Sequence, residues 1–191
     1  MNVKKTSGLV AVVLMVVLCL FYYNHLTNKT QERNEKAKEN RKKTELELLL
    51  EEDLDMNYPS EPRAVVKFYC RIVKCAYNDD ECSEKNLEKL NKQMRKLFSA
   101  DLINNNTEEE QFKDFKKEIK DYQKNSKIIM SYTLSELSQV QFYDIEGEEM
   151  ARLNVVFSLK TKKSYPKLTE QFILRKENDQ WKIVGWTKTT N

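Results

Sequence analysis

The feature that most constrains this chain is an apolar run near its start, Gly8–Leu26. As a helix rising ~1.5 Å per residue, the run would span roughly 28 Å, close to the ~30 Å of bilayer hydrocarbon. Lys4 and Lys5 precede it, and Tyr22 and Tyr23 stand near its end, where amphipathic rings favour the headgroup region. The run therefore predicts a transmembrane anchor.

Two alternatives for this segment are a cleaved signal peptide and a lipoprotein signal. Cleavage needs small residues before the cut, whereas residues 21–24 read Phe-Tyr-Tyr-Asn. A lipid-modified cysteine would need a small residue before it, whereas Cys19 follows Leu18. We therefore interpret the segment as an uncleaved, single-pass signal anchor at residues 8–26.

The charges on either side of the run give conflicting signals about orientation. Lys4 and Lys5 mark the N-terminal side as cytoplasmic, but the other flank holds more basic residues, among them Arg41-Lys42-Lys43. A strict charge count would place the domain in the cytosol, whereas the short basic tail at 1–7 is typical of a signal anchor. We expect a cell-membrane protein with a cytoplasmic tail at 1–7 and an extracytoplasmic C-terminal domain.

A charged segment at 27–56 follows the run. Glu32/Lys36 and Glu39/Lys43 stand four residues apart with the glutamate first, the favourable order for helical ion pairs. We expect a solvated helical stalk, with a basic patch on anionic lipid as the alternative. A stripe at its end, too short for a coiled coil, should dock onto the domain or pair locally: Leu46, Leu49, Leu50 and Leu54.

Residues 57–191 change from a helical period to a period of two. Ser60, Ser83 and Thr107 are expected to cap three helices, with Pro62 in the first turn of the first and Glu110 completing a capping box in the third. Five strands are then expected, at Ile128–Leu134, Val140–Ile145, Met150–Lys160, Lys167–Lys176 and Trp181–Thr189. Helices followed by an antiparallel meander predict an α+β domain.

The inner face of this sheet follows from the alternation in its longest strand. Leu153, Val155, Phe157 and Leu159 share one face of that strand. We expect them to face Val66, Phe68 or Phe115 on the helices.

The composition excludes several kinds of chemistry. Three glycines cannot supply a phosphate-binding loop, and the single histidine, His25, lies at the membrane edge. A net charge of +3 spread over residues of both signs gives no nucleic-acid footprint. We expect no catalytic residue, no metal and no cofactor. The candidates for acid–base chemistry would be Glu170, Asp144, Tyr132 and Tyr143.

The end of the chain, Phe172-Ile-Leu-Arg-Lys-Glu-Asn-Asp-Gln-Trp181-Lys-Ile-Val-Gly-Trp186, resembles the last two strands of the nuclear transport factor two-like superfamily. The segment from Tyr58 to Tyr69, with Val73-Lys-Cys-Ala-Tyr-Asn after it, resembles the opening of uncharacterised membrane-anchored bacterial members. This resemblance implies a cone fold, in which three helices pack in the concavity of a curved antiparallel sheet. The catalytic Asp and Tyr of isomerase members have no counterpart that can be placed in this chain.

Three functions are compatible with these features. The leading hypothesis is a non-catalytic extracytoplasmic domain that binds a protein partner or a small apolar ligand; the oligomeric state is open. The alternatives are a scaffold subunit of a conjugation or type IV secretion-like machine, and an isomerase, dehydratase or cyclase using Tyr and carboxylate groups. The residues that could line a ligand-binding cone are Phe157, Leu159, Phe172, Trp181 and Trp186, with both tryptophans as plain core residues being the alternative.

The last prediction concerns the cysteines. Cys75 and Cys82 flank a break between two helices, a corner that can bring two Cα atoms within the ~4.4–6.8 Å of a disulfide. Such a bond persists outside the cytosol. We predict a Cys75–Cys82 disulfide with Cys70 packed as a small hydrophobe; the alternative is three reduced thiols.

Overall fold

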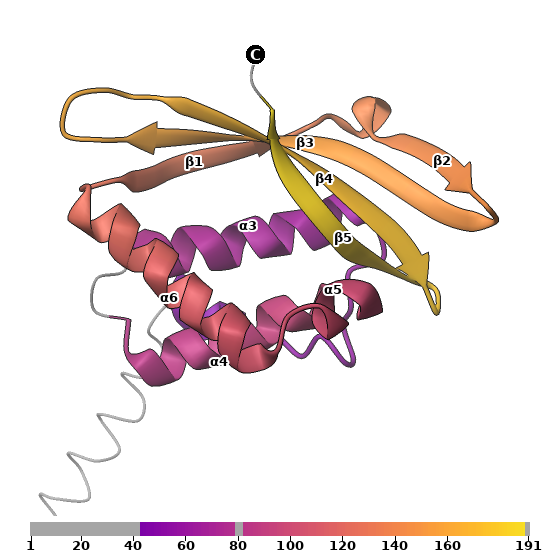
Figure 1. Ribbon diagram of the computed structural model, residues 1–191, viewed down its shortest axis with the longest axis horizontal. Helices are drawn as coiled ribbons and strands as arrows, with labels where there is room; N and C mark the ends of the chain where they lie inside the picture. The colour runs from indigo at the N-terminus through magenta and orange to yellow at the C-terminus, as the bar shows by residue number, and fades with distance from the viewer. Residues whose placement is uncertain (1–42, 79–81, 190–191) are drawn as a thin grey trace, which may run out of the picture. The chain divides into compact units, whose positions relative to one another are not determined.

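The computed structural model describes residues 43–78 and 82–189 and places the start of a compact unit at Thr44. Its helices are α2 (Glu45–Glu51), α3 (Pro62–Asn78), α4 (Glu84–Lys96), α5 (Ala100–Asn104) and α6 (Glu108–Lys124). The strands are β1 (Ile128–Leu134), β2 (Gln141–Ile145), β3 (Glu148–Lys160), β4 (Lys167–Glu177) and β5 (Gln180–Thr189), with a 3-10 turn, η1 (Leu137–Gln139), before β2. Figure 1 shows the helices on one side of a twisted sheet, so the α+β prediction is confirmed.

The sheet is antiparallel and open, in the order β1-β3-β4-β5, with β2 also paired to β3. The long strand β3 pairs with β2 along its first half and with β1 along its second half. Both partners lie on the side of β3 that faces away from β4. Its alternation is as expected: the positions facing the helices are buried, namely Ala151, Leu153, Val155, Phe157 and Leu159. They join Val66, Phe68 and Phe115 of the helices in one core.

The helix starts follow local capping chemistry. The Ser83 hydroxyl accepts from the Asn86 amide at the start of α4, and Thr107 and Glu110 form the predicted capping box of α6. At α3 the prediction was wrong by one residue. Glu61, not Ser60, precedes the helix, and its carbonyl accepts the Val65 amide. Pro62 fits the first helical position because an N–H at that position has no partner within the helix, so proline loses no hydrogen bond there.

The segment assigned to the end of the stalk belongs to the compact unit. Thr44 and Glu47 form a capping box for α2, and Leu49 and Leu54 are buried in the core. The unit therefore begins at Thr44 rather than at residue 57, because the leucine stripe docks onto the domain. The predicted tail at 1–7, the anchor at 8–26 and the rest of the stalk up to residue 42 lie outside the described residues.

One edge of the sheet is covered by a helix connection that the sequence pattern did not predict. After α4, Phe98 forms a parallel bridge to Ile183 of β5, and the Ser99 amide donates to the Ile183 carbonyl at 2.9 Å. Ser99 then caps the short α5. Because this connection satisfies backbone groups on the edge of β5, that edge is partly closed to other chains.

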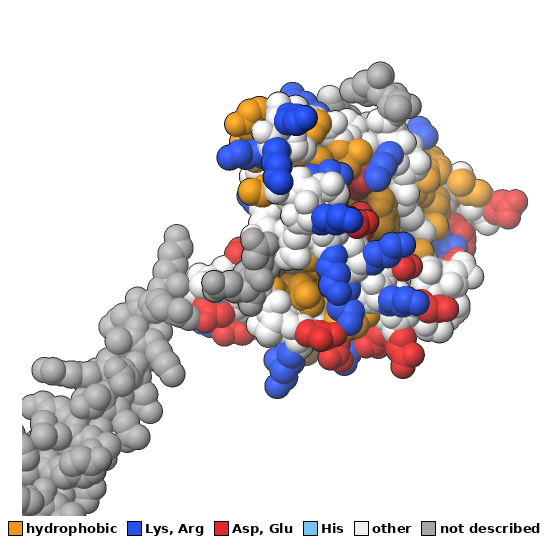
Figure 2. Space-filling view, turned by 60° about the vertical axis from the view of Figure 1, so that its left-hand side comes forward, with side chains coloured by type: hydrophobic (Ala, Val, Ile, Leu, Met, Phe, Trp, Pro, Cys, Tyr) orange, Lys and Arg blue, Asp and Glu red, His pale blue; other side chains and the backbone are white. Residues whose placement is uncertain are grey.

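Charges of both signs cover the surface seen in Figure 2, where Lys and Arg side chains stand among Asp and Glu. Among the residues that the structure describes, the ion pairs between such groups are mostly exposed. Exposed pairs contribute ~0–1 kcal/mol each, so the core and not these pairs stabilises the fold. In the described part of the chain, no helix has both the length and the apolarity needed to cross a bilayer.

Candidate functional site

The four candidate acid–base residues occupy different places. Asp144 lies near the end of β2, where its carboxylate accepts the amide of Gly147 in the β2–β3 turn at 2.9 Å. Tyr143 lies on β2 near the Arg152 guanidinium. Tyr132 lies on β1 beside an open groove, and Glu170 lies on β4 facing the helices. The structure therefore does not bring the four together, and only Glu170 is buried.

Glu170 interrupts an apolar row. On β4, Leu168, Phe172 and Leu174 share its face and pack in or against the core, while Glu170 itself is only 8% exposed. Its carboxyl lines a cavity of about 40 Å³ between the sheet, α3 and α6. The other lining residues are Tyr69, Val73 and Tyr77 of α3, Glu118 and Tyr122 of α6, Ile129 of β1, Phe157 of β3, Leu168 of β4 and Trp186 of β5.

Burial in this cavity raises the pKa of Glu170 and of the tyrosines around it. Burial raises the pKa of Glu170 from 4.5 to about 7; Lys188 opposes this increase, and Glu118 adds to it. Burial, followed by the charge of Glu170, raises the pKa of Tyr69 well above its ordinary value. Burial also raises the pKa of Tyr122 to about 12. At neutral pH the cavity therefore offers phenol hydroxyls and an acid that can gain or lose a proton.

Three of these residues were not singled out from the sequence as site residues. Tyr69 and Tyr122 stand at helical spacing among apolar residues, as core residues do, and Glu118 stands among other charged residues. The Tyr77 hydroxyl donates to Glu118 Oε2 at 2.7 Å, which holds the Glu118 carboxylate at the cavity wall. The available signal was Glu170 itself, a carboxylate on the face of β4 that also carries Leu168, Phe172 and Leu174.

The five residues expected to line a cone divide into two groups. Phe157 and Trp186 line the Glu170 cavity, and Trp186 is 38% exposed at its edge. Leu159 and Phe172 are buried in the core. Trp181 is buried near the other end of β5, where its carbonyl accepts the Tyr58 hydroxyl at 2.8 Å.

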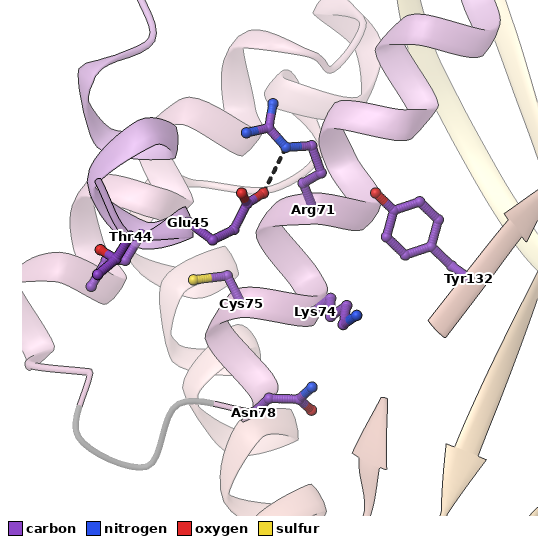
Figure 3. Close-up of a pocket in the computed structure, with 8 residues that line it drawn as sticks. Thr44, Glu45, Arg71, Lys74, Cys75, Asn78 and Tyr132 are labelled. Carbon is purple, nitrogen blue, oxygen red and sulfur yellow. Dashed lines mark hydrogen bonds and ion pairs between the residues drawn. The ribbon is translucent and has the colours of Figure 1, made fainter. Parts of the chain in front are cut away.

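A larger groove of about 810 Å³ lies along one face of α3. Its floor is formed by Arg71, Lys74, Cys75 and Asn78, which share one helix face by their spacing. Thr44 and Glu45 at the start of α2 lie on one side of the groove, and Tyr132 of β1 lies on the other (Figure 3). Leu46 also lines the groove. An ion pair of 2.7 Å between Arg71 Nε and Glu45 Oε1 crosses the groove. Lys74 has no ion-pair partner among residues 43–78 and 82–189.

The groove runs beside a free edge of the sheet. The strand order leaves β1 without a neighbour on one side. There the Asn78 amide takes the place of a strand, donating to the Ile129 carbonyl at 2.8 Å and accepting from the Ile129 amide at 2.9 Å. Just after β1, the Ser135 amide donates to the Asn154 carbonyl of β3. In an antiparallel strand the backbone groups of successive residues point alternately to the two sides. Those of Tyr132 and Leu134 therefore point to the free edge.

No disulfide joins Cys75 to Cys82 in the structure, so the predicted bond is not found. Cys75 lines the groove floor, and both side chains are partly buried against the core, where a cysteine packs as a small hydrophobe. Cys70 is fully buried, as expected. Within the described ranges, no three His, Cys, Asp or Glu side chains are grouped so that they could hold a metal ion.

Comparisons with known proteins give low similarity to two solved structures. One is TraH, described as a transfer protein from the Gram-positive conjugative plasmid pIP501, with 13% identity, a TM-score of 0.37, and coverage of 71% of this chain and 96% of that one. The other is the intermembrane space region of the chloroplast protein ARC6, with 12% identity, a TM-score of 0.34, and coverage of 68% and 94%. A search of curated proteins gave no match. The model of a domain of unknown function, DUF6715, matches residues 1–186, and the chain belongs to this family.

Proposed function

We propose that this chain is a membrane-anchored, extracytoplasmic interaction domain that binds an extended segment of a partner protein along β1, without catalysis. The observation that carries the proposal is the free edge of β1 beside the groove on α3. An added strand would bond the backbone groups of Tyr132 and Leu134 and place alternate side chains in the groove. The anchor at residues 8–26 and the outward orientation rest on the sequence alone.

The charges of the groove indicate the kind of segment it would bind. Arg71 is paired with Glu45, whereas Lys74 adds a cation on the groove floor. An extended segment with an acidic side chain opposite Lys74 would complement this charge. In a scaffold subunit of a conjugation or type IV secretion-like machine, the same edge would bind a neighbouring subunit.

An enzyme is the second candidate, and one observation favours it. Glu170 has a pKa of about 7 and lies in one cavity with the Tyr69 hydroxyl, an arrangement suited to general acid–base chemistry. The cavity of about 40 Å³ holds only about three water-sized groups, at ~10–15 Å³ each. This volume is small for the bulky ring substrates of isomerase and cyclase chemistry, which favours binding as the leading function.

Photo-crosslinking tests the proposed edge. Benzoylphenylalanine replaces Tyr132 in the full chain within its native membranes, and the matched probe replaces Tyr143, a partly buried tyrosine on β2. We expect a discrete crosslinked protein from position 132 and none from position 143. Lys74→Glu should abolish the product, whereas Lys117→Glu on the exposed face of α6 should not. Equal crosslinking from both positions, or a product unaffected by Lys74→Glu, would refute binding at β1.

A further inference from the structure

The Glu170 carboxyl has no partner in the described ranges. No hydrogen bond or ion pair connects it to another described group, although only 8% of the residue is exposed. Lys188 stands opposite it in the β4–β5 register, but Lys188 is exposed. Burial disfavours the charged form of this carboxyl, so a hydrogen-bond donor or a cation placed in the cavity would stabilise it.

Aromatic side chains form much of the cavity wall. Tyr77 and Tyr122 meet edge to face with ring centroids 4.6 Å apart, and the Tyr69 and Trp186 rings are 5.1 Å apart. Aromatic rings attract a cation placed over their faces. Glu118, which is exposed and accepts a hydrogen bond from the Tyr77 hydroxyl, places a second carboxyl group at the rim of the cavity.

The size of the cavity limits the cation. A volume of about 40 Å³ is enough for about three water-sized groups. An ammonium group is of water size and has three donors, whereas a trimethylammonium group is much larger. Because Trp186 is 38% exposed, an alkyl chain attached to the ammonium group can leave the cavity beside its ring.

We infer that the cavity formed by Glu170, Glu118 and the surrounding aromatic rings binds the ammonium group of a small primary alkylamine. The ammonium donates to the Glu170 carboxylate and to tyrosine oxygens, and the alkyl chain lies against Trp186. The residues that line this cavity and those that line the groove on α3 do not overlap. The inference therefore does not rest on the proposed partner binding.

Titration of the full chain with butylammonium chloride tests this inference, with the binding heat and tryptophan fluorescence as readouts. 1-Butanol is the neutral control of the same shape, and tetramethylammonium is the oversized cation. We expect butylammonium alone to bind. Glu170→Gln should weaken binding by about tenfold or more, because a charge-assisted hydrogen bond is lost. Glu109→Gln, on the exposed start of α6, should leave binding unchanged.

A pH series adds an independent readout. Butylammonium stays protonated below its pKa of roughly 10.4, so ionisation of Glu170 should raise the affinity about tenfold between about pH 6 and about pH 8. The titratable groups that face Glu170 from the elements packed on it are Tyr69, Cys70, Tyr77, Glu118, Tyr122 and Lys188. Of these, burial raises the pKa of Tyr69, Cys70, Tyr77 and Tyr122, so these four do not ionise in this range.

Tyr122→Leu supplies a second variant if Glu170→Gln does not fold, because it removes an aromatic wall from a half-buried position. It should also weaken butylammonium binding. Three results would overturn the inference: no binding of butylammonium to the wild type, equal binding of 1-butanol, or an affinity that neither variant changes.

Discussion

Glu170→Gln should make this protein more stable at neutral and alkaline pH. Glutamine has the shape of the glutamic acid side chain and stays neutral, whereas Glu170 must ionise in a buried site as the pH rises. The folded protein raises the pKa of this carboxyl from 4.5 to about 7. Between these values the unfolded chain loses the proton first, so ionisation favours the unfolded state.

The size of the effect follows from that difference. A gap from 4.5 to about 7, at ~1.4 kcal/mol per pH unit, amounts to about 3 kcal/mol of lost stability once both states are ionised. The loss is absent well below pH 4.5, grows between the two values, and is complete above about pH 7. Because Glu170 is only 8% exposed, solvent screens little of this effect.

Chemical denaturation of the full chain at about pH 5 and about pH 8 measures the prediction. The variant should gain about 2–3 kcal/mol over the wild type between these two conditions. Glu109→Gln, exposed on α6, should show no such trend. A difference between Glu170→Gln and the wild type that does not change with pH would refute the reasoning. A wild type that is the more stable protein at about pH 8 would also contradict it.

Three further predictions concern the core, a helix cap and the cysteines. Phe157→Ala should cost about 3–5 kcal/mol of unfolding free energy, because the ring is buried on the inner face of β3; a cost below ~1 kcal/mol would contradict this burial. Thr107→Ala should cost about 1 kcal/mol by removing the capping box of α6, whereas Thr107→Ser should cost much less. Maleimide labelling of the denatured chain should modify Cys75 and Cys82 without reductant, because no disulfide joins them in the structure; labelling that requires prior reduction would contradict this.

Local chemistry explains what could be predicted of the fold. The strand β1 has the predicted bounds, Ile128–Leu134, because β-rich residues lie between polar turn residues there. The caps at Ser83 and Thr107 depend on a side chain and a backbone amide three residues apart, so they can be recognised in a linear sequence. The packing partners of a helix cannot be recognised in this way. The sequence left open whether the leucine stripe before residue 57 docks onto the domain or pairs locally. In the structure it packs against α3 and α4, whose surfaces are distant from it in sequence.

The candidate site was predictable only in part. Glu170 could be named because a carboxylate at an inward strand position breaks the alternation. Its neighbours Tyr69, Tyr77 and Tyr122 come from two helices, and their periodicity is the same as that of ordinary core residues. The sequence pattern shows which face of each helix is buried, but not which faces meet around one carboxyl. The groove was missed because its floor depends on the exposed face of α3 lying beside an edge strand.

Helix α3 contributes to both sites through different faces. Tyr69, Val73 and Tyr77, each four residues apart, line the Glu170 cavity, whereas residues 71, 74, 75 and 78 form the groove floor. Since side chains four apart share one face of a helix, a substitution at Lys74 changes the groove and leaves the cavity wall in place. Partner binding and amine binding can therefore be lost separately. A Lys74→Glu chain that still binds butylammonium, and a Glu170→Gln chain that still crosslinks from position 132, would show two independent sites on one helix.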